Sequence, residues 1–551
     1  MAVADPELTA RSTGVRTHRR EALAIAIALC VLNLILLVRV HNEAEDSIGY
    51  LENIRRGVAS DIFNPYHLVH SWLGWIAFRI ADGAGYDGGP LVPVQAMNAV
   101  FGAAGIGLLW LLMRTAVDGR LAAAAATGVV GLSYGYWAYS LGADVYAFSA
   151  MTLILALFAA YRAALDPSLP RFAILGLATG ATVLAHNTNV LFGVVGVTAI
   201  LLATRDPRLM LRFGAAYAAA VVVMVVPLYL VALATVDANT PSEANEWLTD
   251  YAQSGEWGVI SAQSAPKAAV GAARAFVGGL SAFALDDVRD LADRASGNQS
   301  LREETYLVRD YPRELAVVLL AASAAAVAAL ALLAMRWLRR PALDRPARTL
   351  ALLSLAWLVP YAVFVTWWEP VNPEFWIALW VPAAILIAVP LAGDGARATG
   401  LVFILLGALF IVNLAGNIAP QLTEENDYWR ERTAWYESET SPGDLVVTNG
   451  FIQSAYLRYF AHADVLDIDE WDIVETNEAL EEIDDLIQAS DASRVLFSKE
   501  AFLPASDEYS DCQPGTRPCL YIADALRQRF EPRSRVVYES ELETVWELVD
   551  R

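Results

Sequence analysis

Long apolar runs recur along the first three quarters of this 551-residue chain, separated by short loops that carry arginine. The hydrophobic share is 56%, only 18% of the residues are charged, and the mean hydropathy is +0.40. So much apolar surface with so little charge to cover it excludes a purely cytosolic globular protein. The runs lie at 21–40, 91–113, 121–140, 143–163, 172–186, 189–204, 213–235, 314–335, 349–366, 375–392 and 398–417. They predict a polytopic α-helical membrane protein with about 11 transmembrane helices.

The placement of arginine predicts which loops face the cytoplasm. Four arginines precede the first run, and others follow the second, fourth, sixth, eighth and tenth. Because basic loops stay inside, residues 1–20 form a cytoplasmic tail, and loops 41–90 and 236–312 lie outside. No small-residue cleavage site follows the first run, so we expect a retained helix. The stretch 172–204 is too long for one span and has arginines on both sides, which predicts a hairpin of two short spans.

With an odd number of crossings, residues 418–551 lie on the extracytoplasmic side and form a separate domain. Short β-like runs at 445–447, 465–468, 495–497 and 536–538 alternate with helical stretches at 453–460, 477–488 and 521–529, which predicts an α/β fold. From residue 421 onward, 30 Asp and Glu oppose 11 Lys and Arg, so this tail holds most of the net charge of −22. That charge argues against nucleic-acid binding. The acidity indicates a solvated surface, with a direct role in substrate binding as the alternative.

Two cysteines of the tail flank a short turn. Cys512 and Cys519 are close enough in sequence to close a small disulfide loop if the tail faces an oxidising compartment. Two separate thiols are the alternative, and the spacing alone does not choose between them.

The first external loop gathers polar residues. Ile48, Leu51 and Ile54 recur at helical spacing within 45–57, which predicts a helix with Asp46 near its N-terminus. A carboxylate there is also a good helix cap, the plain structural interpretation. Six more polar candidates follow in this loop: Glu45, Tyr50, Arg55, Arg56, His67 and His70. The two histidines are three residues apart and share one helix face, where hydrogen bonding to headgroups or loops is a simpler role than metal binding.

Three later external turns also carry polar clusters. The second turn has Asp144 and Tyr146, the third has His186 and Asn189 at the tip of the short hairpin, and the fourth has Glu369. Helix caps, simple turns and an interfacial belt of aromatic residues explain each cluster separately. Their shared side of the membrane favours a common site instead.

The order of these segments resembles the GT-C superfamily of membrane glycosyltransferases, which includes protein O-mannosyltransferases and the aminoarabinose transferase of lipid A. Four segments carry the resemblance: Asp46-Ser-Ile-Gly-Tyr50 with Asn64-Pro-Tyr-His67-Leu, Asp144-Val-Tyr146, Gly176-Leu-Ala-Thr-Gly180 through His186-Asn-Thr-Asn189, and Glu369-Pro before Phe375-Trp376. The likeness spans most of 21–417, and the tail resembles the extracytoplasmic domains appended to many members.

The resemblance implies a polyprenyl-phosphate-linked sugar donor, an acceptor that is a protein, lipid or glycan, and transfer with inversion on the extracytoplasmic face of the cell membrane. It assigns the general base to Asp46, with Glu45 as the neighbouring alternative. Arg55, Arg56, His67 or His70 would then bind the departing phosphate, and Asp144 would orient partners of Asp46, bind sugar or help to hold a metal. The remaining substrate-binding candidates are Tyr50, Tyr146, His186, Asn189 and Glu369.

Metal dependence stays open, with a divalent ion such as Mg or Mn as the candidate, because members of the superfamily differ and the first loop has no clear Asp-x-Asp. A transporter or flippase of a lipid-linked or small substrate is the main alternative function. Transporters usually show paired repeats and charged residues near the bilayer midplane. The ionisable candidates here lie at the outer boundary instead, which favours the transferase.

Overall fold

The computed structural model describes residues 6–41, 46–117, 119–253, 258, 260–296, 302–339, 342–391, 396–468, 476–502 and 519–549. The chain divides into two compact units, which are described separately. The helical unit comprises Met1–Val38, Asn53–Gly279 and Val317–Ala419. The tail unit comprises Arg39–Glu52, Leu280–Ala316 and Pro420–Arg551. Glu45, Cys512 and the turn after Cys512 lie outside the described residues.

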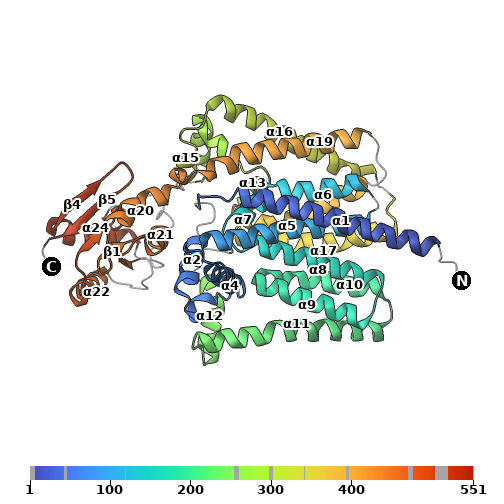
Figure 1. Ribbon diagram of the computed structural model, residues 1–551, viewed down its shortest axis with the longest axis horizontal. Helices are drawn as coiled ribbons and strands as arrows, with labels where there is room; N and C mark the ends of the chain where they lie inside the picture. Colours follow the sequence, from blue (N-terminus) through green and yellow to red (C-terminus); the bar gives the residue numbers. More distant parts are fainter. Residues whose placement is uncertain are drawn as a thin grey trace. The chain divides into compact units, whose positions relative to one another are not determined.

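The helical unit is built from helices, and its long apolar helices run roughly along one direction (Figure 1). In chain order they are α1 (Pro6–Ile35), α3 (Ala59–Ile62), α4 (His70–Gly83), α5 (Leu91–Ala116), α6 (Arg120–Leu132), α7 (Tyr134–Leu141), α8 (Tyr146–Leu165), α9 (Leu169–Ala185), α10 (Gly193–Ala203), α11 (Pro207–Thr235), α12 (Pro241–Gln253), α13 (Ser264–Val277), α16 (Arg313–Ala334), α17 (Arg345–Trp368), α18 (Pro373–Ala388) and α19 (Ala396–Asn413). A further helix, α2 (Asp46–Arg56), begins in the tail unit, and the first residues of α16 also belong to that unit.

Seven described segments are long and apolar enough to cross a membrane: Leu91–Ala116, Tyr146–Leu165, Pro207–Thr235, Arg313–Leu338, Arg345–Trp368, Pro373–Leu391 and Ala396–Leu422. Three shorter apolar segments are Arg120–Leu132, Leu169–Ala185 and Asn187–Ala203. The last two correspond to the predicted hairpin. These helices confirm a polytopic α-helical fold, whereas the count of eleven crossings stays a prediction.

The run expected as one helix at 121–140 is broken in two, which corrects that expectation. Ser133 adopts an extended conformation between α6 and α7, and its hydroxyl donates to the carbonyl of Val130 at 2.7 Å. The freed carbonyl of Leu132 accepts a hydrogen bond of 2.6 Å from the Asn413 side chain. A helix break within an apolar region needs such a partner because lipid offers none.

Glycines let neighbouring helices approach closely. A Cβ added at Gly176 of α9 would lie 2.3 Å from the backbone oxygen of Tyr217 on α11. At Gly107 of α5, it would lie 3.0 Å from the backbone oxygen of Ala22 on α1. Small residues at helix contacts are the usual means of packing membrane helices, because an apolar helix surface gains little by moving out of lipid onto another helix.

The tail unit contains a five-stranded sheet in the order β2-β1-β3-β5-β4. The strands are β1 (Leu445–Thr448), β2 (Asp464–Asp467), β3 (Val495–Phe497), β4 (Ser534–Glu539) and β5 (Thr544–Leu548). β1 pairs in parallel with β2 and β3, and β5 pairs antiparallel with β3 and β4. The four strands predicted from the sequence are confirmed, and β5 was missed. The α/β class of the tail is therefore confirmed.

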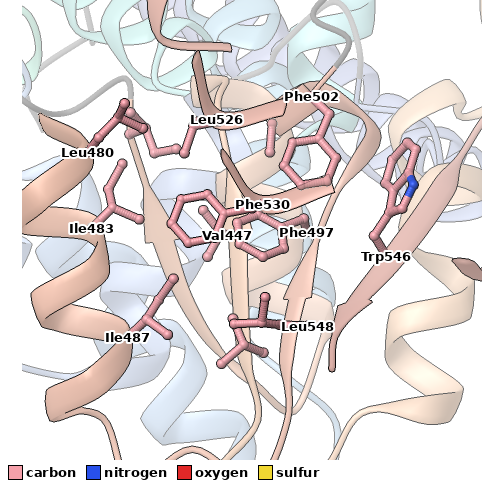
Figure 2. Packing of buried hydrophobic residues seen from close by; sticks show 13 residues of the cluster. Val447, Leu480, Ile483, Ile487, Phe497, Phe502, Leu526, Phe530, Trp546 and Leu548 are labelled. Carbon is pink, nitrogen blue, oxygen red and sulfur yellow. The ribbon is translucent and has the colours of Figure 1, made fainter. Parts of the chain in front are cut away.

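Helices flank this sheet, and the central strands pack against helices on both faces. The helices are α20 (Tyr428–Glu439), α21 (Phe451–Phe460), α22 (Thr476–Ala489), α23 (Lys499–Phe502) and α24 (Cys519–Phe530). The tail unit also includes α14 (Asp286–Ser296) and α15 (Arg302–Leu307) from the earlier segment. Successive strand residues point to opposite faces, so Val446 packs with Tyr436 and Leu457, while Val447 packs with Phe497 and Phe530. Figure 2 shows the second of these clusters. Burial on both faces explains the continuous apolar runs.

A buried ionic network joins α20 to α23 and to the turn before β5. The Arg432 guanidinium is fully buried and lies 2.6 Å from the Glu500 carboxylate and 2.7 Å from the Glu543 carboxylate. Gln453 donates to Glu543 at 2.9 Å, and the backbone N–H of Lys499 donates to the same carboxylate at 2.6 Å. Charges this deeply buried are tolerated only when paired and hydrogen-bonded, so the network specifies how these elements pack.

Candidate active site

Asp46 begins α2, the helix predicted for 45–57 and confirmed here as Asp46–Arg56. Ile48, Leu51 and Ile54 are fully buried, as their spacing predicts, which fixes the rotation of the helix. Asp46 is exposed as a residue, and its carboxylate accepts a hydrogen bond of 3.3 Å from the Tyr50 hydroxyl. Loss of hydration among the surrounding protein atoms raises the pKa of Asp46, and the Tyr50 hydrogen bond partly opposes this rise. Such a carboxylate suits a general base, although its place in the first turn also suits the helix dipole.

The segment just before Asp46 is tied to the tail unit's own residues. The backbone N–H groups of Arg39 and Val40 donate to the Gln421 carbonyl at 2.7 and 3.2 Å. The backbone N–H of His41 donates to the Asp427 carboxylate at 2.9 Å. Asp427 also caps α20 and accepts from the Tyr456 hydroxyl at 2.9 Å. These contacts fix residues 39–41, which precede the candidate base in the sequence.

Two buried groups of this anchor have opposite pKa shifts. Burial raises the pKa of Asp427 to about 6, against which its hydrogen bonds act, and burial lowers the pKa of His41 to about 4. Folded Asp427 therefore binds its proton at a higher pH than in the unfolded chain, so its contribution to stability grows as the pH falls from about 6. Folded His41 resists its proton, so its contribution is lost as the pH falls from 6.5 towards 4.

We expect the two contributions to offset one another in the wild-type protein. Each of these pKa changes corresponds to about 3 kcal/mol in the free energy of unfolding. Between pH 7 and pH 4, Asp427→Asn should therefore lose about 2.5 kcal/mol of tail-unit stability relative to wild type. His41→Gln should instead gain stability relative to wild type over the same pH range. Hydrogen exchange of the β1 and β3 amides in the full chain, corrected for intrinsic rates, measures both. If the opening free energies of wild type and Asp427→Asn changed in parallel with pH, titration of Asp427 would not contribute to stability.

A second cluster lies within the helical unit, where α8 and α18 begin. The Tyr146 hydroxyl donates to the Glu374 carboxylate at 2.7 Å, and the Tyr139 hydroxyl reaches its other oxygen at 3.4 Å. The ring of His186 lies 5.5 Å from that of Tyr146 and 4.6 Å from that of His67. Three of the predicted residues, His67, Tyr146 and His186, are thus brought together from widely separated segments. We call Tyr139, Tyr146, His186, Glu374 and Phe375 the Glu374 cluster.

Burial lowers the pKa of His67, and it lowers the pKa of His70 to about 4. Both imidazoles are therefore neutral at neutral pH. A neutral imidazole offers a phosphate a hydrogen bond but no positive charge. His67 and His70 could therefore bind the departing phosphate only through hydrogen bonds. The positive charge for that phosphate would have to come from arginine.

Asp144 is buried next to the start of α8. Its carboxylate accepts the backbone N–H of Val145, and its carbonyl accepts from the Asn98 side chain. Asn98 also donates to the Gly142 carbonyl at 3.1 Å. These bonds fix the turn before α8, the local role that the sequence gives as the alternative for Asp144.

Other predicted site residues have mainly local contacts. Asn189 is buried, donates to Ser149 at 2.9 Å, and accepts from the Tyr361 hydroxyl at 2.9 Å, so it joins helices of the bundle. Arg56 is largely exposed and pairs with Asp61 at 3.2 Å. Glu369 accepts from the Asn372 side chain at 3.3 Å. Arg55, near the end of α2, is exposed. Glu374 was not singled out from the sequence, although an acidic residue just after Asn372-Pro373 marks a helix start.

Among the described residues, no group of three or more His, Cys, Asp and Glu side chains is arranged to hold a metal ion. The candidates therefore fall into two sets that are described separately: Asp46 with Tyr50 in the tail unit, and the Glu374 cluster in the helical unit. The chemistry they offer is that of carboxylates, neutral imidazoles and aromatic rings.

Comparison with known proteins identifies the fold. A family model described as dolichyl-phosphate-mannose-protein mannosyltransferase matches residues 65–232. The crystal structure of ArnT from Cupriavidus metallidurans bound to undecaprenyl phosphate matches with a TM-score of 0.59 and 13% identity, over 96% of this chain and 97% of that one. The apo structure of the same protein gives a TM-score of 0.58 and 14% identity, over 95% and 97%. No curated protein sequence matched the chain. The fold is therefore shared over almost the entire length.

Proposed function

We propose that this chain is a membrane glycosyltransferase of the GT-C superfamily and that it transfers a sugar from a polyprenyl-phosphate-linked donor to an acceptor outside the cytoplasm. The observation that carries the proposal is the full-length likeness of its fold to a protein crystallised with undecaprenyl phosphate. The family model, whose description names a polyprenyl-phosphate sugar, supports the same donor class. The acceptor is a hydroxyl group of a protein, a lipid or a glycan.

Asp46 acts as the general base in this proposal. Its carboxylate removes the proton of the acceptor hydroxyl while that oxygen forms a bond to the anomeric carbon. The bond between the anomeric carbon and the phosphate oxygen breaks, and its electron pair leaves with the polyprenyl phosphate. Attack opposite to the leaving group inverts the anomeric configuration. A raised pKa and the exposure of the residue both support this role for Asp46.

The leaving phosphate needs positive charge or hydrogen-bond donors more than it needs a proton, because a polyprenyl phosphate already leaves readily. Arg55 and Arg56 at the C-terminal end of α2 supply that charge in this proposal. His67 and His70 add neutral hydrogen-bond donors. Glu45, beside Asp46 in the sequence, stays the alternative base.

The arginine pattern supports a cytoplasmic N-terminus and an extracytoplasmic tail, with transfer on the outer face. In that arrangement, the donor is presented on the outer leaflet, and the acceptor reaches the enzyme from outside. Accessibility labelling of single-cysteine variants in sealed cells tests the orientation. Labels should reach a cysteine placed in the β4–β5 turn but not one placed before α1.

A deletion strain tests the proposed reaction in cells. Mass spectrometry of its surface glycoproteins, glycolipids and glycans should show one glycosyl residue missing, and a plasmid copy of the wild-type chain should restore it. The mass of the missing unit identifies the sugar, and the molecule that lacks it identifies the acceptor. An unaltered glycan profile with loss of transport of a solute would contradict the transferase.

A further inference from the structure

The Glu374 cluster combines a carboxylate with several aromatic rings, and some of its members are more deeply buried than others. Tyr139 and His186 are buried, whereas Tyr146, Glu374 and Phe375 are only half-buried. The cluster therefore joins buried residues to residues that keep part of their surface accessible. A carboxylate and rings that are only partly buried can still contact a ligand, which a fully buried cluster cannot.

Fixed contacts hold the Glu374 carboxylate in one orientation. Hydrogen bonds from Tyr146 and Tyr139 reach its two oxygens at 2.7 and 3.4 Å. At the backbone, Asn372 caps α18 by accepting the N–H of Glu374 at 3.1 Å. The carboxylate is therefore positioned from two sides before any ligand arrives, which lowers the entropy cost of binding.

The two tyrosines that bind this carboxylate belong to a group of aromatic rings that pack against one another. The ring of Tyr146 lies 5.4 Å from that of Tyr139 and 6.1 Å from that of Phe375, and both pairs are close to perpendicular. The ring of His186 lies 6.5 Å from that of Phe375. A pyranose ring has an apolar C–H face that packs on such rings and a rim of hydroxyl groups that donate to a carboxylate.

We propose that the Glu374 cluster is the subsite for the glycosyl unit of the lipid-linked donor, with Glu374 accepting hydrogen bonds from sugar hydroxyls. This inference rests on the proposed function and adds the residues that recognise the sugar. The donor, not the acceptor, is assigned to it because α8 and α18 both begin here and both belong to segments long and apolar enough to cross the membrane. A sugar anchored by a lipid tail lies at the ends of such helices. Glu374 is then a binding residue, and the base remains Asp46.

Binding to the purified full-length protein in nanodiscs tests the subsite. The probes are undecaprenyl phosphate alone and undecaprenyl phosphate carrying mannose, glucose, N-acetylglucosamine or 4-amino-4-deoxyarabinose. Wild-type protein should bind at least one glycosylated lipid more tightly than undecaprenyl phosphate. Glu374→Gln should weaken binding of that glycosylated lipid about tenfold, which is the effect expected from losing one charge-assisted hydrogen bond. Its affinity for undecaprenyl phosphate should stay unchanged.

Two matched variants separate recognition from folding. Asp82→Asn makes the same chemical change at an exposed pair with Arg79 and should leave all affinities unchanged. Glu374→Asp keeps the charge and should recover part of the lost affinity. In turnover, Glu374→Gln should raise KM for the donor more than it lowers kcat, since the contact is made already in the bound ground state.

Three results would overturn the subsite. They are equal affinity of wild type for all glycosylated lipids and for undecaprenyl phosphate, no effect of Glu374→Gln, and an equal loss of affinity for glycosylated and bare lipid. Failure of wild type to bind any polyprenyl phosphate would instead contradict the proposed function itself. Binding of undecaprenyl phosphate by wild type thus tells whether the subsite alone or the proposed function has failed.

Discussion

Asp46→Asn should lower the rate of sugar transfer by about 10²- to 10⁴-fold while leaving membrane insertion and abundance unchanged, because an amide cannot take the acceptor proton. Asparagine has nearly the same shape as aspartate, and the apolar face of α2, which holds the helix, is untouched. The rate of release of polyprenyl phosphate from a labelled donor measures the effect. Asp82→Asn serves as the control and should retain wild-type activity.

The pH dependence of the rate gives a second test of the same residue. If Asp46 is the base, activity falls as the pH decreases through its pKa, because the protonated carboxyl cannot accept a proton. Tyr50→Phe removes a hydrogen bond that holds this pKa down, so the acidic limb of the profile should move to higher pH. A role of Asp46 in helix capping alone would leave the limb in place. It would also give Asp46→Asn a small effect, since asparagine caps helices as well as aspartate does.

Arg432→Met should destabilise the tail unit by about 3–5 kcal/mol at neutral pH. The substitution removes the cation that lies between Glu500 and Glu543, and both carboxylates are then left buried without it. Desolvation already raises the pKa of Glu543, with Arg432 as the main opposing influence, so loss of Arg432 should raise it further. Hydrogen exchange of the β3 amides in the full chain reports the change in opening free energy.

Two further variants separate buried charge from packing. Arg535→Ala removes an exposed pair with Glu547 on the same sheet and should cost no more than about 1 kcal/mol. Adding Glu500→Gln and Glu543→Gln to Arg432→Met should recover most of the loss, because neutral amides no longer require the cation. If Arg432→Met behaved like Arg535→Ala, the network would not be important for stability.

Local patterns of the sequence predicted local structure well. The spacing of Ile48, Leu51 and Ile54 gave both the extent of α2 and its buried face, because helical periodicity depends only on near neighbours. The apolar runs located the membrane helices for the same reason. β5 was missed even though Val545, Trp546 and Leu548 are apolar, because a short strand beside a β-turn gives a weak signal.

Features that depend on distant partners were not predictable from the sequence. The break at Ser133 is compensated by Asn413, 281 residues away in sequence from Leu132. Glu374 is held by Tyr146, 228 residues earlier, so nothing near Glu374 in the sequence marks it as part of a cluster. Asn189 looked like a ligand of substrate because it stands in a polar turn, yet Tyr361 and Ser149 bind its side chain inside the bundle.

Reconstitution in proteoliposomes tests the central claim most directly. The purified chain is supplied with undecaprenyl phosphate carrying a labelled sugar, together with the acceptor identified from the deletion strain. The account predicts transfer of the label to the acceptor with inverted anomeric configuration and release of one undecaprenyl phosphate per sugar, all abolished by Asp46→Asn. Movement of the intact labelled lipid between leaflets without any transfer, equally in wild type and Asp46→Asn, would contradict it.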